Sequence, residues 1–164
     1  MAEEAADTQE TKPPVEADAI PAGRADLSKR FIAAIIDAVI AMVVGFIPLI
    51  GGLIATAYWL VRDGLDIEFM DHRSIGKKLL KLRPVRLDGQ PVDIVTSMKR
   101  NWMFALGGVA QLLAFTIIGL IIAIPLAFLV MLIAIVEVVL VLTDSEGRRL
   151  GDKFAETKVI EVQD

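Results

Sequence analysis

The chain contains no cysteine, only one histidine and few serines. The absence of cysteine excludes disulfide bonds, iron–sulfur clusters and thiol catalysis. The single histidine, His72, has no cysteine or carboxylate array near it and no serine or aspartate at a motif spacing, so neither a zinc site nor a catalytic triad is indicated. We therefore expect no cofactor, no metal and no enzymatic activity.

Basic residues are missing from two long stretches, 31–61 and 102–143, and each stretch holds a single acid, Asp37 or Glu137. An ionised side chain at the centre of a bilayer costs at least ~2.5–3.5 kcal/mol, which explains the lack of charge. The mean hydropathy is +0.60, and the apolar residues are gathered into these stretches. This composition indicates an integral membrane protein.

The lengths of the two stretches bear on the number of membrane-spanning helices. A bilayer core ~30 Å thick needs about 20 helical residues, so the longer stretch suffices for two helices with a turn near 119–125. The shorter stretch has Pro48, Gly51 and Gly52 at its middle, which predict a hairpin of two short or tilted helices. The expected spans are therefore 29–47, 50–62, 102–119 and 124–142.

The distribution of charge supports four spans. With four, every Lys and Arg lies on one side of the membrane, and both turns on the other side are uncharged. The positive-inside rule makes the charged side cytoplasmic. The predicted fold class is thus an all-α membrane protein with four transmembrane helices as two hairpins, and with both termini in the cytoplasm.

The remaining segments are polar. Residues 1–26 are acidic and rich in proline, which predicts a disordered tail before a membrane domain over 27–162. Between the hairpins lies a cytoplasmic loop, 63–101, and a C-terminal segment covers 143–164. Within the loop, Ser74 should cap a short amphipathic helix whose basic residues contact anionic lipid headgroups rather than nucleic acid. Those basic residues are Lys77, Lys78, Lys81 and Arg83.

Short β-strands are also expected on the cytoplasmic side. Residues 85–87 and 92–94 flank Asp88-Gly89, a dipeptide typical of hairpin turns. Residues 157–162 alternate in polarity as a strand does. A patch of two or three strands is consistent with these patterns.

Asp37 lies on a helix face with Ala33, Ala41 and Gly45, and small residues in such a row allow helices to pack closely. We therefore expect Asp37 to point into the bundle, with Glu137 at a similar depth. Two interpretations remain open. The acids bind a cation or exchange a proton, or each is neutral or paired with Arg30, Lys29 or Arg149 and fixes the packing.

Four blocks in order resemble the RDD family of bacterial membrane proteins. They are KRFIAAIID at 29–37, SIGKKLLKLRPV at 74–85, RN at 100–101 and RLGDKFAETKVI at 149–160. The arginine and two aspartates of the family name would be Arg30, Asp37 and Asp152, with Asp144 as a nearby alternative for the last. The resemblance implies an inner-membrane protein of a poorly characterised group, for which transport of ions or small solutes has been suggested.

Two functions follow as hypotheses. The first is an ion or proton-coupled transporter, acting through Asp37 and assembled as a homo-oligomer. The second is a non-transporting membrane subunit that docks partner proteins through its cytoplasmic face. A further hypothesis concerns position: Arg30 bridges Asp37 inside the membrane and Asp152 outside it.

Overall fold

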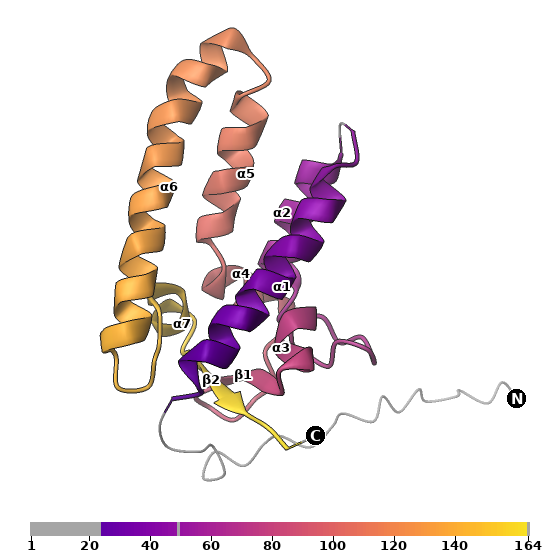
Figure 1. Ribbon diagram of the computed structural model, residues 1–164, viewed down its shortest axis with the longest axis vertical. Helices are drawn as coiled ribbons and strands as arrows, with labels where there is room; N and C mark the ends of the chain where they lie inside the picture. The colour runs from indigo at the N-terminus through magenta and orange to yellow at the C-terminus, as the bar shows by residue number, and fades with distance from the viewer. Residues whose placement is uncertain (1–23, 49, 164) are drawn as a thin grey trace, which may run out of the picture.

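The structure, a computed structural model, describes residues 24–48 and 50–163 (Figure 1). Most of the predicted tail, residues 1–23, lies outside the described residues. The described part is mainly helical, with one small sheet. Its elements in chain order are α1 (Leu27–Gly45), α2 (Gly51–Val61), α3 (Ile75–Leu79), β1 (Leu82–Arg86), α4 (Ile94–Arg100), α5 (Met103–Leu113), α6 (Ile117–Thr143), α7 (Leu150–Phe154) and β2 (Thr157–Glu161).

The four most apolar helices form two hairpins, α1–α2 and α5–α6, which meet through α2 and α5 (Figure 1). The outer helices α1 and α6 diverge from one another. The short helices and the sheet gather at the end of the molecule where α1 begins and α6 ends. We call this end, formed by α3, α4, α7, β1 and β2, the charged end.

The predicted turn near 119–125 is wrong. The break between α5 and α6 lies at residues 114–116, because the Thr116 side chain accepts a hydrogen bond from the Gly119 N–H at 2.9 Å and caps α6. Pro125 lies inside α6. Proline removes one backbone hydrogen bond there, a loss that helices in membranes tolerate. The expected spans 102–119 and 124–142 are therefore replaced by α5 and α6.

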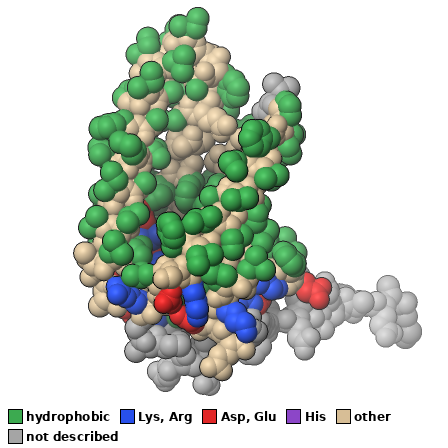
Figure 2. Space-filling view, in the orientation of Figure 1, with side chains coloured by type: hydrophobic (Ala, Val, Ile, Leu, Met, Phe, Trp, Pro, Cys, Tyr) green, Lys and Arg blue, Asp and Glu red, His purple; other side chains and the backbone are tan. Residues whose placement is uncertain are grey.

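Only α6, within the described residues, has both the length and the hydropathy of a membrane-crossing helix. Its 27 residues extend about 40 Å, beyond a bilayer core of ~30 Å. Helices α2 and α5 have 11 residues each and extend only about 16 Å. The surface of α6 is strongly apolar, with Ile117 at 87% exposure, as expected of a helix that faces lipid (Figure 2).

The sheet at the charged end consists of β1 and β2, which pair antiparallel from Leu82↔Glu161 to Arg86↔Thr157. The strand predicted at 157–162 is therefore confirmed. The hairpin between 85–87 and 92–94 is wrong, because the Asp93 side chain accepts a hydrogen bond from the Thr96 N–H and starts α4 at Ile94. The residues after the Asp88-Gly89 turn therefore cap and begin a helix, and they do not form the expected second strand.

Helix α3 confirms the expected cap, since the Ser74 side chain accepts a hydrogen bond from the Lys77 N–H. Gly76 packs directly on α1, where an added Cβ would lie 2.1 Å from the Ala33 carbonyl oxygen. Ala33 also joins Leu82 and Val159 in a small apolar core. The contact between α3 and α1 therefore brings the polar loop up to the level of Asp37.

Candidate functional site

A cavity of about 290 Å³ lies between α1 and α6 at the charged end. Figure 2 shows a hollow between these helices with acidic and basic atoms at its lower part. Five basic and two acidic side chains line the cavity, together with apolar ones. The charged lining residues are Arg30, Asp37, Arg62, Lys77, Arg100, Glu137 and Arg149.

Asp37 is 1% exposed and, as expected, lies on the buried face of α1 with Ala33 and Ala41. Four groups donate to its carboxylate. Arg62 Nη1 and Ser74 Oγ each lie 2.6 Å from Oδ2. The Gly76 N–H and the Tyr58 hydroxyl donate to Oδ1 at 2.8 and 3.1 Å. Asp37 is therefore a paired and fully bonded carboxylate.

The partner of Asp37 is Arg62, not Arg30, Lys29 or Arg149. Arg62 immediately follows α2 and is 4% exposed, and its guanidinium lies 3.9 Å from the centre of the Trp59 ring. Helix α2 is only half the length needed to cross a bilayer, so its end is level with the middle of α1. The short second helix thus places a basic residue beside Asp37.

Asp63, which follows Arg62, is fully buried among cations. Its carboxylate lies 2.5 Å from Lys77 Nζ and 3.7 Å from Arg100 Nε. Burial alone would raise the pKa of Asp63, but Lys77, Arg100 and Arg62 outweigh it and hold the pKa far below its usual value. Burial lowers the pKa of Lys77, and Asp63 opposes that effect. The expected headgroup contact of Lys77 is corrected: this side chain points inward.

Asp152, at the start of α7, is also fully buried. Its carboxylate lies 2.8 Å from Arg100 Nε, 3.5 Å from Arg30 Nη2 and 3.4 Å from Arg149 Nε. These cations lower the pKa of Asp152 although burial raises it. The expected bridge is therefore half present. Arg30 contacts Asp152, but it also donates to the Gly147 carbonyl, and Arg62 takes the place beside Asp37.

Glu137 is 6% exposed on α6 and lines the same cavity as Asp37. It accepts a hydrogen bond from the Gly151 N–H at 3.1 Å and lies 3.8 Å from Arg149 Nε. The two acids thus share a cavity, as their similar depth suggested, but each has its own partners. No group of three or more metal-ligating side chains occurs among the described residues.

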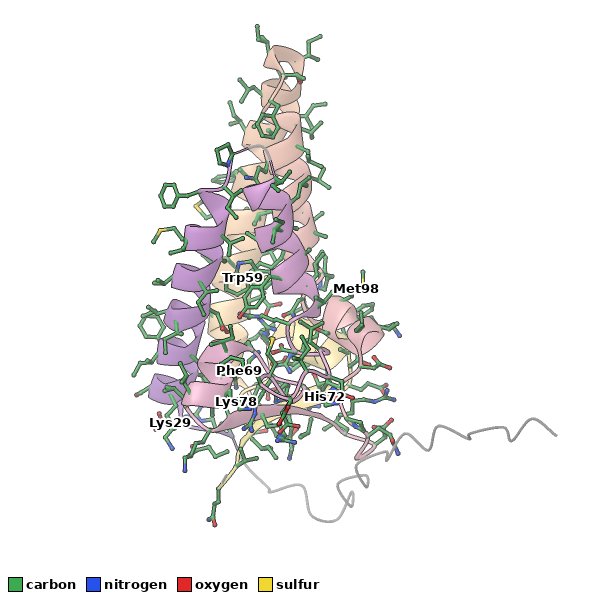
Figure 3. All side chains as sticks on the ribbon, turned by 90° about the vertical axis from the view of Figure 1, so that its right-hand side faces the viewer. Lys29, Trp59, Phe69, His72, Lys78 and Met98 are labelled. Atoms are coloured by element: carbon green, nitrogen blue, oxygen red, sulfur yellow. The ribbon has the colours of Figure 1, made fainter. Side chains whose placement is uncertain are left out.

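The other basic residues expected at headgroups lie on the outside of the charged end. Lys78 donates to the Glu68 carbonyl at 3.2 Å and lies 5.5 Å from the Phe69 ring (Figure 3). Arg83 pairs with Asp71, and Lys81 is exposed. Headgroup contact by these three remains a prediction.

Sequence reasoning missed the site roles of Arg62, Asp63 and Arg100. All three stand at the borders of the apolar stretches: Arg62-Asp63 directly after the first, and Arg100 two residues before the second. A charge at such a border is usually taken as a boundary marker in water. Burial of these residues depends on the short α2, which returns only partway along α1.

Mainly helical architecture, a lipid-type apolar surface and a charged cavity at one end define a membrane protein. The sequence model of the RDD family matches residues 48–156, more than half of the chain, so this protein belongs to the RDD family of bacterial membrane proteins. The matched range includes Arg62, Arg100 and Asp152, whereas Arg30 and Asp37 precede it. Searches of curated proteins and of solved structures returned no match.

Proposed function

We propose that this protein moves ions or small charged solutes across the bacterial inner membrane, with the solute site in the cavity that Asp37 and Glu137 line. In this proposal all four apolar helices cross the bilayer and the charged end faces the cytoplasm. The main support for this proposal is the cavity at the charged end of the apolar helices, because seven charged side chains line it. Such a concentration of buried charge in a membrane protein is a default functional site.

The charge of the lining favours an anionic solute over the cation or proton suggested by the acids alone. Five basic side chains face two acids, so the cavity attracts negative charge. Asp37 already accepts four hydrogen bonds, which disfavours it as the carrier of a cation. Its role in this proposal is to position Arg62 in the cavity wall.

The test is solute flux into liposomes that contain the purified protein, under chloride, phosphate, sodium and proton gradients. We expect flux of an anion, and its loss in Arg149→Gln, which removes a cation from the cavity. Arg148→Gln is the matched control, because Arg148 adjoins Arg149 but does not line the cavity. Absence of flux under every gradient would overturn the proposal.

A second candidate is a non-transporting membrane subunit that docks partner proteins through the charged end. It is favoured by one observation: the short helices there expose apolar side chains, including Val95, Met98 and Phe154. Two results together would support this candidate over transport. The liposomes would show no flux, and a partner protein would copurify from native membranes with the wild type but not with Met98→Lys.

A further inference from the structure

The cavity has an apolar mouth above a charged floor. Phe31 on α1 and Val138 and Leu142 on α6 line it, and these side chains are 67%, 59% and 56% exposed. They continue the apolar outer surfaces of the two helices. The hollow between α1 and α6 in Figure 2 opens on this same surface. A molecule that enters here comes from the side, between two helices that face lipid.

Two buried guanidinium groups on the floor retain unused donors. Arg100 is 2% exposed and Arg62 is 4% exposed. Within the described residues, Arg100 Nη1 and Arg62 Nε have no hydrogen-bond partner, and neither have the carboxylate oxygens Asp63 Oδ2 and Glu137 Oε2. These two atoms of the guanidinium groups are buried within the wall and do not face the cavity, so the cavity attracts an anion through the positive charge of its lining and not through these donors.

The formal charge of the cluster also leaves room for an anion. Arg30, Arg62, Lys77, Arg100 and Arg149 line the cavity, against Asp37 and Glu137. Counting Asp63 and Asp152, which pair with these cations from behind the wall, five positive charges still face four negative ones. A single negative charge would balance the cluster.

We propose that the cavity binds an anionic phospholipid, with the phosphodiester beside Arg100 and Arg149 and an acyl chain along Phe31, Val138 and Leu142. A phosphodiester carries one negative charge, which matches the excess, and guanidinium groups bind phosphate oxygens strongly. The apolar mouth favours a lipid over free phosphate, which shares the headgroup chemistry but gains nothing from the apolar wall. This inference goes beyond the proposed function, since it assigns a membrane lipid to the same cavity and does not depend on transport.

The test uses the full chain in nanodiscs of phosphatidylcholine with increasing phosphatidylglycerol, and counts retained lipid after detergent exchange by native mass spectrometry. Ala34 is exposed and lines the mouth, so Ala34→Phe should block entry without disturbing the core. Ala38→Phe is the matched control, because Ala38 is exposed one turn further along α1 and does not line the cavity.

We expect the wild type and Ala38→Phe to retain phosphatidylglycerol preferentially. Retention by Ala34→Phe and Arg149→Gln should be roughly tenfold weaker, which is the loss expected for a blocked site or for one charge-assisted hydrogen bond. Equal retention by Ala34→Phe and the wild type would overturn the inference. So would full displacement of the lipid by inorganic phosphate. Anion flux without lipid retention would leave the proposed function standing alone, whereas retention without flux would remove transport and keep the lipid site.

Discussion

Asp37 and Arg62 meet where water is largely excluded, so neither can lose its partner without leaving a buried charge. Breaking a buried ion pair from one side is far more costly than removing an exposed one. The same holds for Asp63 with Lys77 and for Asp152 with Arg100. At the scale of residues, the site is therefore a set of mutually dependent charges.

Asp37→Asn should lower the free energy of unfolding by about 3–5 kcal/mol, because it removes the carboxylate that pairs directly with the buried Arg62. Denaturant titration of the protein in mild detergent measures this loss. Asp66→Asn serves as the control, since the Asp66 side chain is 84% exposed and should change stability little. An unchanged midpoint in Asp37→Asn would show that the pair does not stabilise the fold.

Acid should destabilise the protein through Asp63 and Asp152, whose pKa values are held below the ordinary value of 3.8. Burial opposes this shift, but the surrounding cations prevail. The unfolded chain binds protons at these acids more readily than the folded chain does. These acids therefore stabilise the fold above about pH 4, and their stabilisation is lost as the pH falls below that value. Unfolding midpoints at about pH 6 and about pH 3 measure the effect.

Asp152→Asn provides the internal comparison for this acid response. It removes one of the two carboxylates to which the acid response is assigned, so the variant should be less stable at neutral pH and lose less stability on acidification. A variant with the same acid-induced loss as the wild type would mean that Asp152 does not contribute to the pH dependence.

At the scale of elements, the close contact of α3 with α1 depends on a residue without a side chain. Gly76→Ala would place a methyl group 2.1 Å from the Ala33 carbonyl oxygen. Overpacking of this kind costs about 1–3 kcal/mol. Gly107→Ala in α5 is the matched control, because an added Cβ meets nothing within 4 Å there. Thermal unfolding in detergent should therefore show a lower midpoint for Gly76→Ala and no loss for Gly107→Ala.

Much of the element pattern was predictable because apolar stretches and caps are local. The hairpin at Pro48 and the cap at Ser74 both follow from neighbouring residues. The α5–α6 turn was misplaced because the prediction weighted Gly119 and Pro125 above the capping hydroxyl of Thr116. The partner of β1 lies more than 70 residues away, so no local turn could reveal it.

The site was predictable only in part, for the same reason. Asp37 and Glu137 stood out because lipid disfavours isolated charge. The pairing of Asp37 with Arg62 depends on how far α2 returns along α1, a property of three-dimensional packing. Lys77 reads as a surface residue of an amphipathic helix until Asp63 is placed beneath it.

At the scale of the whole molecule, all charged elements lie at one end, and the proposed orientation places that end in the cytoplasm. The absence of cysteine makes this testable by single substitutions. Ser145→Cys lies at the charged end and Thr116→Cys at the opposite end, and both positions are exposed. A membrane-impermeant maleimide should label Thr116→Cys in intact spheroplasts and Ser145→Cys only in inverted vesicles. The reverse pattern would contradict the orientation.

The antiparallel pairing of β1 with β2 has a consequence for the timing of synthesis. Arg30 and Arg100 belong to segments made early, whereas Asp152 and the strand that secures it emerge after both hairpins. Until then, these arginines lack one of their acidic partners. The order of translation thus makes residues 149–161 the closing step of assembly, and a nascent chain halted before them leaves Arg30 and Arg100 without the carboxylate of Asp152.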